Sequence, residues 1–188
     1  MAANQVRIIG GRHRGRRLAF VPGRGLRPTP DRVRETLFNW LRHDIHGARC
    51  LDLFAGSGAL GLEALSRGAA YLHAIERNRA AARRLRDNLG LLHETAADVV
   101  QDDALRQLKT PPAVPFDIAF VDPPFDADLL ASVCGLLEDR GWLHDGALIY
   151  VEQDAVRPWP ELPPTWQVLR EGRAGQSAQR LLRRSNPG

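Results

Sequence analysis

Short apolar segments alternate with longer segments of helical periodicity along most of the chain. This pattern predicts strands at 50–54, 71–75, 97–100, 116–121 and 147–151, and helices at 60–67, 78–89, 126–139 and, more briefly, after 102–103. Strands that alternate with helices form a parallel sheet with helices on both faces. The segments 165–170 and 177–184 then predict a closing antiparallel pair, turning around Gly172 and Gly175.

The first thirty residues follow a different pattern. Residues 6–9 and a segment reaching 18–20 predict a two-stranded ribbon, which the Gly- and Pro-rich stretch 22–30 ends. We therefore divide the chain into a β-hairpin arm, 1–28, and a main domain, 29–188.

A helix start follows this arm. Thr29 is expected to be the N-cap, Pro30 the first helical residue and Asp31 the acid of the first turn. The helix should present one apolar face, formed by Val33, Leu37, Trp40 and Leu41.

A glycine-rich loop follows the strand predicted at 50–54. Gly56, Gly58 and Gly61 match the G-x-G-x-x-G fingerprint, and Glu76 lies twenty residues beyond the first of them, where a ribose-binding acid is expected. Glycines let the backbone approach a ligand closely, and the helix after them presents unpaired N–H groups. Alone, this pattern leaves two ligands open, a nicotinamide dinucleotide and S-adenosylmethionine.

Acidic residues at the strand ends separate these two ligands. Asp52 stands directly before the loop, where a carboxylate would repel a pyrophosphate but suit the ammonium and sulfonium charges of S-adenosylmethionine. Glu76 can accept hydrogen bonds from the ribose of either ligand and does not discriminate. Asp103 and Ala104 could offer a carboxylate and an N–H group to an adenine edge. The structural alternatives are a helix N-cap for Asp103 and a strand-end turn for Asp52.

A second motif, Asp122-Pro123-Pro124-Phe125, follows the strand predicted at 116–121. The prolines remove two N–H donors and stiffen the turn. Asp122 and the carbonyl of Pro123 can then accept hydrogens from an exocyclic amine, which aims its lone pair at a methyl donor. Phe125 offers a face on which a planar base can stack. A plain strand-ending turn with a core Phe is the alternative.

Charge is concentrated at the start of this 188-residue chain. Its net charge is +4, yet residues 1–34 carry nine arginines and one acid, Asp31, so the rest is slightly acidic. A basic arm on an acidic body suggests a polyanionic partner. A solvated basic tail is the alternative, since arginine is also frequent elsewhere in the chain.

Other features exclude several classes of protein. No apolar run is long enough to cross a bilayer and the N-terminus lacks an apolar signal core, so we expect a cytoplasmic location. Cys50 and Cys134 fall in predicted core segments and should be buried free thiols. We expect no metal site, because the histidines have no partner cysteines.

The motifs together resemble a known family. Residues 52–61, Glu76, Asp103 and 122–125 are similar to class I S-adenosylmethionine-dependent methyltransferases with a D-P-P-[FY] motif. Flanking motifs narrow this to the bacterial 16S ribosomal-RNA guanine-N2 methyltransferases: Arg7-Ile8-Ile9-Gly10-Gly11, Arg16-Arg17-Leu18, the run from Arg27 to Leu41, and Ala174-Gly175-Gln176. The resemblance covers residues 6–184. Pro30, where the family often has Thr, and the proline-rich linker 154–165 are departures.

The resemblance implies a Rossmann-like α/β fold with a seven-stranded, mostly parallel sheet, an antiparallel last strand pair and an N-terminal β-hairpin. It also implies methylation of one guanine N2 in 16S rRNA, on the 30S subunit or an assembly intermediate. We assume a monomer.

Each group of site residues then has an expected role. Cofactor contacts are expected from Asp52, Phe54, Ala55, Gly56, Ser57, Gly58, Glu76, Arg77, Asp103, Ala104 and Asp122. The target amine and base should meet Asp122, Pro123, Pro124 and Phe125. Phosphates should meet Arg7, Arg12, Arg14, Arg16, Arg17, Arg27, Arg32 and Arg34.

Three other functions stay open on the sequence. An N6-adenine methyltransferase on DNA or RNA is the closest competitor, because D-P-P-F alone does not choose between exocyclic amines. A dinucleotide-dependent oxidoreductase would bind NADH, but leaves D-P-P-F and the basic arm unexplained. A non-catalytic RNA-binding assembly factor is disfavoured only because every expected acid is present.

Overall fold

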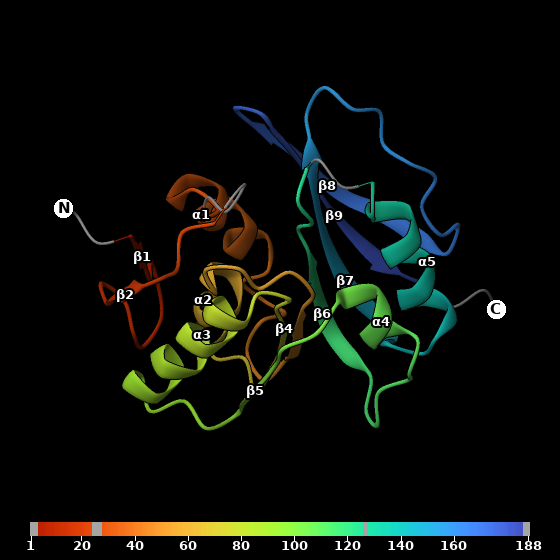
Figure 1. Ribbon diagram of the computed structural model, residues 1–188. Helices are drawn as coiled ribbons and strands as arrows, with labels where there is room; N and C mark the ends of the chain where they lie inside the picture. Colours follow the sequence, from red (N-terminus) through yellow and green to blue (C-terminus); the bar gives the residue numbers. More distant parts are fainter. Residues whose placement is uncertain (1–3, 24–27, 126–127, 186–188) are drawn as a thin grey trace.

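The computed structural model describes residues 4–23, 28–125 and 128–185 of the chain. Its main sheet consists of β3 (Arg49–Asp52), β4 (Tyr71–Ile75), β5 (Ala97–Val100), β6 (Phe116–Val121), β7 (Leu143–Asp154), β8 (Trp166–Ala174) and β9 (Ser177–Arg184). The strands lie in the order β5-β4-β3-β6-β7-β9-β8 (Figure 1). A separate antiparallel ribbon consists of β1 (Gln5–Arg7) and β2 (Arg17–Ala19).

The chain builds this sheet outward from β3 in two directions. β3 pairs in parallel with β4 on one side and with β6 on the other. β5 extends the first side and β7 the second, again in parallel, and antiparallel β9 then pairs with both β7 and β8. Open α/β sheets bind ligands at the point where the strand order reverses, outside the carboxyl ends of the strands. Here that point lies between β3 and β6.

Helices cover both faces of the sheet. They are α1 (Asp31–Trp40), α2 (Ala59–Ser66), α3 (Arg79–Leu91), α4 (Ala104–Leu108) and α5 (Leu130–Asp139). The first three lie on one face and the last two on the other (Figure 1). The alternation of side chains along a strand explains the two cores: Phe120 of β6 joins the cluster under α1–α3, and Val121 joins the one under α4 and α5. In the described residues, no helix is both long and apolar enough to span a membrane.

The N-terminal ribbon shares the core of the main domain. Val6, Ile8 and Leu18 are almost fully buried, in the cluster that also contains Leu37 of α1. The backbone N–H of Arg12 donates to the carbonyl of Ser66 at the end of α2, at 2.8 Å. The boundary at residue 28 stays a prediction, but the ribbon is packed against the domain.

A buried carboxylate fastens the ribbon to α2. Glu63 has no exposed surface and accepts the N–H groups of Ile9 and Gly10 at 2.9 and 2.8 Å. Two guanidinium groups also donate to it, Arg34 Nη1 at 3.3 Å and Arg67 Nε at 2.7 Å. The ribbon, α1 and α2 therefore meet at one ion-pair network.

The start of α1 differs from the prediction in its cap. The N-cap is Pro30 rather than Thr29, and no side chain caps the helix. Thr29 instead takes part in tertiary contacts: its carbonyl accepts Arg34 Nε at 3.1 Å, and its side chain lies close enough to Asp122 to oppose the rise in the pKa of that carboxyl. Asp31 begins the helix as its first acidic residue, as expected.

Other boundaries also differ from the prediction, and β3 ends at Asp52 rather than at residue 54. The helix predicted at 126–139 begins at Leu130, and Asp126 lies outside the described residues. β7 is much longer than 147–151, because it is paired on both sides. Gly172 lies inside β8, opposite Gln179, so only Gly175 belongs to the turn. Both cysteines are buried free thiols, as predicted.

We predict that Glu63→Ala destabilises the protein by about 3–5 kcal/mol, because it leaves Arg34 buried without its partner. Urea unfolding measures the change. Glu35→Ala, an exposed acid of the same helix as Arg34, is the control and should change the stability by less than about 0.5 kcal/mol. A loss below about 1 kcal/mol for Glu63→Ala would contradict the anchoring role.

Candidate active site

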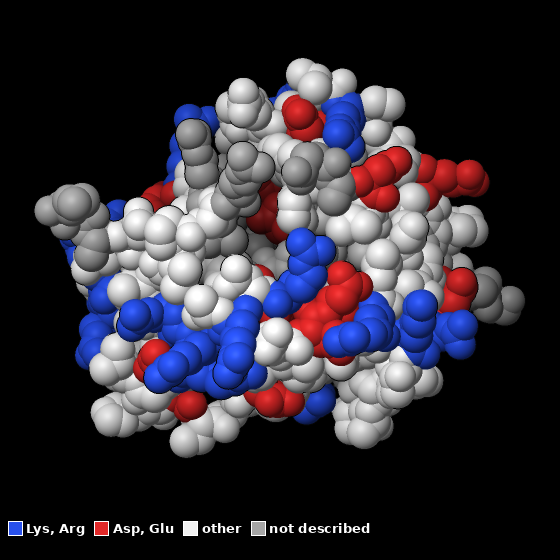
Figure 2. Space-filling model, viewed as in Figure 1, with Lys and Arg blue, Asp and Glu red and all other residues white. Residues whose placement is uncertain are grey.

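Acidic residues gather at one edge of the sheet. Asp52 ends β3, Glu76 follows β4, Asp102 and Asp103 follow β5, and Asp122 follows β6. Because these strands are parallel, all of the acids lie at the carboxyl edge, and two of them flank the switch point. Acidic atoms lie deep in a hollow near the centre of one face of the molecule (Figure 2).

Asp52 lies beneath the glycine loop. It is 3% exposed, and the N–H groups of Phe54 and Gly61 donate to its carboxylate. Burial raises its pKa to about 7, the two hydrogen bonds oppose this, and the charge of Glu76 adds to it. Asp52 therefore supports the loop from inside, and a direct cofactor contact stays a prediction.

Glu76 links the loop to the end of β4. One carboxylate oxygen accepts the N–H of Gly56 at 2.8 Å and the other accepts the N–H of Asn78 at 2.6 Å. The side chain is half-buried. Each oxygen keeps a further lone pair, so the carboxylate can also accept two hydroxyl donors.

Two glycines of the fingerprint are required by packing. Gly58 caps α2 with φ +78°, and a Cβ there would lie 2.5 Å from Leu85 Cδ1. A Cβ on Gly61 would lie 2.8 Å from Leu72 Cδ2, and 3.4 Å from Asp52 Oδ2. The close approach of α2 to β4 and α3 therefore fixes the shape of the loop.

The acids after β5 have local partners. Asp103 is the N-cap of α4 and accepts the N–H of Arg106 at 3.2 Å, which is the structural alternative raised by the sequence. Asp102 accepts Arg106 Nε at 2.6 Å and Gln107 Nε2 at 3.0 Å. Hydrogen bonds from Arg106 and then Gln107 lower the pKa of Asp102 to about 2. Ala104 is buried in the first turn of α4, and an adenine contact at this turn stays a prediction.

The D-P-P-F motif leaves β6 beside the glycine loop. Asp122 and Phe125 are half-buried, Pro123 is buried and Pro124 is exposed. Burial raises the pKa of Asp122 well above its usual value, and the charges of Glu152 and Asp52 add to this shift. The motif thus combines a carboxylate in a negative, poorly solvated setting with an accessible aromatic ring.

Glu152 was not among the site residues predicted from the sequence. This residue lies near the end of β7, is 5% exposed, and accepts Tyr150 Oη at 2.8 Å and Ser177 Oγ at 2.5 Å. A charged residue directly after the apolar run 147–151 was the available signal.

The arginines predicted to bind phosphate fall into different groups. Arg34 is 1% exposed and bonded to Asp31 and Glu63, so its prediction as a phosphate contact is wrong: it is an internal ion-pair partner. Arg7 and Arg12 are about half-exposed but paired with Asp31 and Glu94. The remaining described members are exposed, namely Arg14, Arg16, Arg17 and Arg32. Arg27 lies outside the described residues.

A second set of exposed arginines lies on α3 and was not predicted to bind RNA. Figure 2 shows basic side chains gathered over this helix, at the lower left. The exposed cations of the helix are Arg79, Arg83, Arg84 and Arg86. The helix contacts the ribbon, since Asn88 Nδ2 donates to the carbonyl of Ala19 at 2.9 Å. The two basic segments therefore adjoin each other.

A cavity of about 330 Å³ opens between the ribbon and the start of α1. Its lining includes Arg7 and Arg17 from the ribbon, and Thr29. Since the Thr29 side chain also opposes the rise in the pKa of Asp122, the cavity lies near the D-P-P-F carboxylate.

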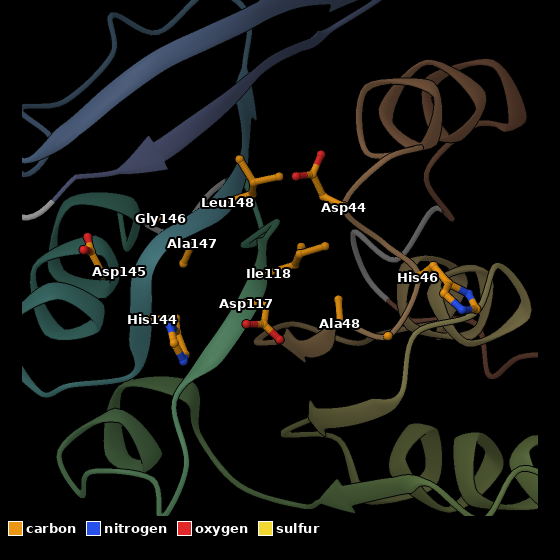
Figure 3. Close-up of a pocket in the computed structure, with 11 residues that line it drawn as sticks. Asp44, His46, Ala48, Asp117, Ile118, His144, Asp145, Gly146, Ala147 and Leu148 are labelled. Atoms are coloured by element: carbon orange, nitrogen blue, oxygen red, sulfur yellow. The ribbon is translucent and has the colours of Figure 1, made fainter.

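Another cavity, of about 280 Å³, lies away from these residues (Figure 3). Asp44, Asp117 and Asp145 line it, together with His46 and His144. It opens at the amino ends of β3 and β6, where Asp117 accepts the N–H of Arg49 at 2.8 Å. Within the described residues, no group of three or more His, Cys, Asp or Glu side chains is placed to hold a metal ion.

The fold and the carboxyl-edge site define a class I methyltransferase type of α/β protein. A family profile described as "Conserved hypothetical protein 95" matches residues 6–183. The ribosomal RNA small subunit methyltransferase D of Escherichia coli K12 is 52% identical over 99% of this chain and 93% of its own length. The enzyme of the same name from Haemophilus influenzae is 45% identical over 96% and 94%.

Solved structures agree with this assignment. The structure of yhhF from Escherichia coli, a candidate methyltransferase, matches with a TM-score of 0.91 and 51% identity, covering 96% of this chain and 98% of that one. The chain therefore belongs to the family of conserved hypothetical protein 95 and of the ribosomal RNA small subunit methyltransferases D.

We predict that Gly58→Ala destabilises the protein by about 1–3 kcal/mol, because Ala must adopt a positive φ and its Cβ collides with Leu85. Gly90→Ala is the matched control. A Cβ on Gly90, within α3, meets open space, so this change should stabilise by about 0.5–1 kcal/mol. Thermal and urea unfolding measure both, and equal effects at the two glycines would contradict the packing argument.

Proposed function

We propose that this protein transfers the methyl group of S-adenosylmethionine to the exocyclic N2 of a guanine in 16S rRNA, on small-subunit particles. The observation that carries the proposal is the position of Asp122–Phe125 at the end of β6, beside the glycine loop that follows β3. The names of the Escherichia coli and Haemophilus influenzae relatives support a small-subunit rRNA substrate.

The residues of the carboxyl edge fit S-adenosylmethionine. Glu76 keeps free acceptor lone pairs for a ribose diol while it holds Gly56. The first turn of α2 offers unpaired N–H groups, and the charge of Asp52 lies beneath the loop. One oxygen of Asp103 stays free of the N-cap bond and could accept an adenine amine. When bound, the cofactor supplies an electrophilic methyl group on a sulfonium sulfur.

The protein's part in the reaction is to hold the target amine. Asp122 and the carbonyl of Pro123 accept its two hydrogens, which draws the nitrogen lone pair out of conjugation with the ring. Pro123 and Pro124 have no N–H groups that would compete for these acceptors. Phe125 stacks on the base and fixes its plane. Positioning and electrostatics supply most of the rate enhancement in such a site.

The choice of guanine rests on the sequence resemblance. An adenine N6 amine presents the same two hydrogens to Asp122 and Pro123, so the chemistry of the motif leaves both bases possible. The N-terminal motifs, which include the ribbon and the start of α1, favour the guanine-N2 enzymes.

Two basic surfaces support an RNA substrate. Exposed arginines of the ribbon adjoin those of α3, and Arg7 and Arg17 line the cavity beside Thr29. Because Thr29 also lies near Asp122, a phosphate bound at this cavity would hold the RNA strand near the target amine. Phosphate contacts position an RNA without reading its sequence.

We predict that purified protein labels N2-methylguanosine in 16S rRNA. The assay uses 30S subunits from a strain that lacks the endogenous activity and S-adenosylmethionine labelled in its methyl group. Label in N6-methyladenosine would overturn the guanine assignment, and absence of label despite cofactor binding would overturn the catalytic role on this particle.

We predict that Asp122→Ala lowers turnover in this assay by about 10²–10³-fold, with cofactor affinity kept within a few-fold. Near-normal turnover would reject the proposed mechanism.

We also predict that the ribbon arginines set the salt dependence of binding to 30S subunits. The triple variant Arg14→Gln/Arg16→Gln/Arg17→Gln should reduce the slope of log affinity against log salt by about 2, since each lost phosphate contact removes roughly 0.7. Lys109→Gln/Arg140→Gln, two exposed cations at the ends of α4 and α5, is the control and should leave the slope unchanged. An equal slope in the triple variant would exclude the ribbon from the RNA interface.

A further inference from the structure

Glu152 lies beside Asp122 on the neighbouring strand. Val121 and Val151 are partners in the pairing of β6 with β7, and each acid follows one of these residues. Gln179 of β9 is the partner of Glu152 on the other side. A row of polar side chains therefore crosses three strands at the carboxyl edge, beyond a core that is otherwise apolar.

The side chain of Glu152 is fixed by hydroxyl groups. Tyr150 Oη donates to one carboxylate oxygen at 2.8 Å and Ser177 Oγ to the other at 2.5 Å. Gln179 Nε2 donates in turn to Ser177 Oγ. All four side chains are buried. This contrasts with buried Glu63, whose partners include two guanidinium groups.

The groups that face this pair are mostly acidic or neutral. Asp52 faces Asp122 from β3, Tyr150 faces Glu152 from β7, and the Thr29 hydroxyl approaches from the start of α1. Burial raises the pKa of Glu152, although the hydrogen bonds from Ser177 and Tyr150 oppose this. Burial likewise raises the pKa of Asp122, and the charge of Glu152 is the second cause. Two neighbouring carboxylates in such a setting favour a state in which only one of them is ionised.

We propose that Glu152 is a positioning residue of the target-amine site, and that it acts with Asp122 as one carboxylate pair that can hold a single proton. This inference rests on the proposed function, because the proton comes from the methylated amine. Glu152 itself stays within its hydroxyl network, and Asp122 touches the substrate.

The pair gives the reaction a proton acceptor. The lone pair of the guanine N2 forms the new N–C bond, while the S–C bond breaks and its electrons stay on sulfur. N2 then carries a positive charge and still holds both of its hydrogens, one of which must leave as a proton. That proton passes to the Asp122 carboxylate, which leaves a neutral methylated amine and a singly protonated carboxylate pair. The negative charge of Glu152 favours this transfer, because it stabilises the proton on its neighbour.

The pH dependence of the methyl-transfer rate follows from the repulsion between the Glu152 and Asp122 carboxylates. Asp122 must be ionised to accept the amine hydrogen, so the rate falls as the pH drops through the pKa of Asp122. Glu152 raises that pKa. Glu152→Gln removes the charge and keeps the length of the side chain, so the acidic limb of the methyl-transfer rate should move to lower pH by about one unit.

The test follows the Asp122 carboxyl carbon by NMR in the free protein, with ¹³C-labelled aspartate and Asp122→Asn to assign the signal. Glu152→Gln should shift the titration of Asp122 to lower pH by about one unit. Glu138→Gln is the matched control: Glu138 is another hydrogen-bonded glutamate, held by Trp166 and Arg184 on α5, and its loss should leave the titration unchanged.

An unchanged Asp122 titration in folded Glu152→Gln would overturn the inference. If that variant does not fold, Ser177→Ala decides: loss of this donor raises the pKa of Glu152, so the pH dependence of the Asp122 signal should change, and an unchanged signal would overturn the inference. The titration needs neither cofactor nor RNA. A shifted titration with label in a different nucleoside would therefore reject the proposed function alone, whereas N2-methylguanosine formed without the shift would reject the role of Glu152 alone.

Discussion

The reversal of the strand order at β3 is the constraint on which the rest of the structure depends. Because β4 and β6 lie on opposite sides of β3, the connections after β3 and β6 leave the sheet on opposite faces and open a gap at its carboxyl edge. The glycine loop and the D-P-P-F turn are the two walls of this gap. Neither motif could form a site alone, since each is the end of one strand and needs the other strand beside it.

The N-terminal ribbon is held to this frame by charge neutralisation inside the protein. Glu63 receives two backbone N–H groups from the ribbon and two guanidinium groups from α1 and α2. Such a network loses much of its stability when one member is removed, because the remaining charges stay buried. It also fixes the start of α1, and with it Thr29, next to Asp122. The network thus links the basic ribbon to the start of α1, which lies near the D-P-P-F turn.

Much of the fold and the site could be predicted from local pattern. The strands β4, β5 and β6 have the predicted bounds because each is a short, largely apolar run that is followed by a polar residue. Prediction failed where tertiary contacts outweighed local preference. In the sequence, Arg34 cannot be distinguished from the other arginines of the basic segment. Its ion pair with Glu63 becomes evident only from the fold. Glu152 shows no motif, since its importance arises from a strand neighbour thirty residues earlier in the chain.

The two buried acidic centres differ in how their charge is balanced, and this difference separates structure from function. Glu63 has its counter-charges within the protein, so its network is complete without a ligand. Asp52, Asp122 and Glu152 are held by N–H and hydroxyl donors at the edge of the sheet, and the charges of Glu152 and Asp52 add to the rise in the pKa of Asp122. The free-energy cost of removing these carboxylates from water is not offset by counter-charges within the protein. A site with this excess of negative potential is preorganised for positive charge, whether on a bound sulfonium or on an amine that gains a methyl group.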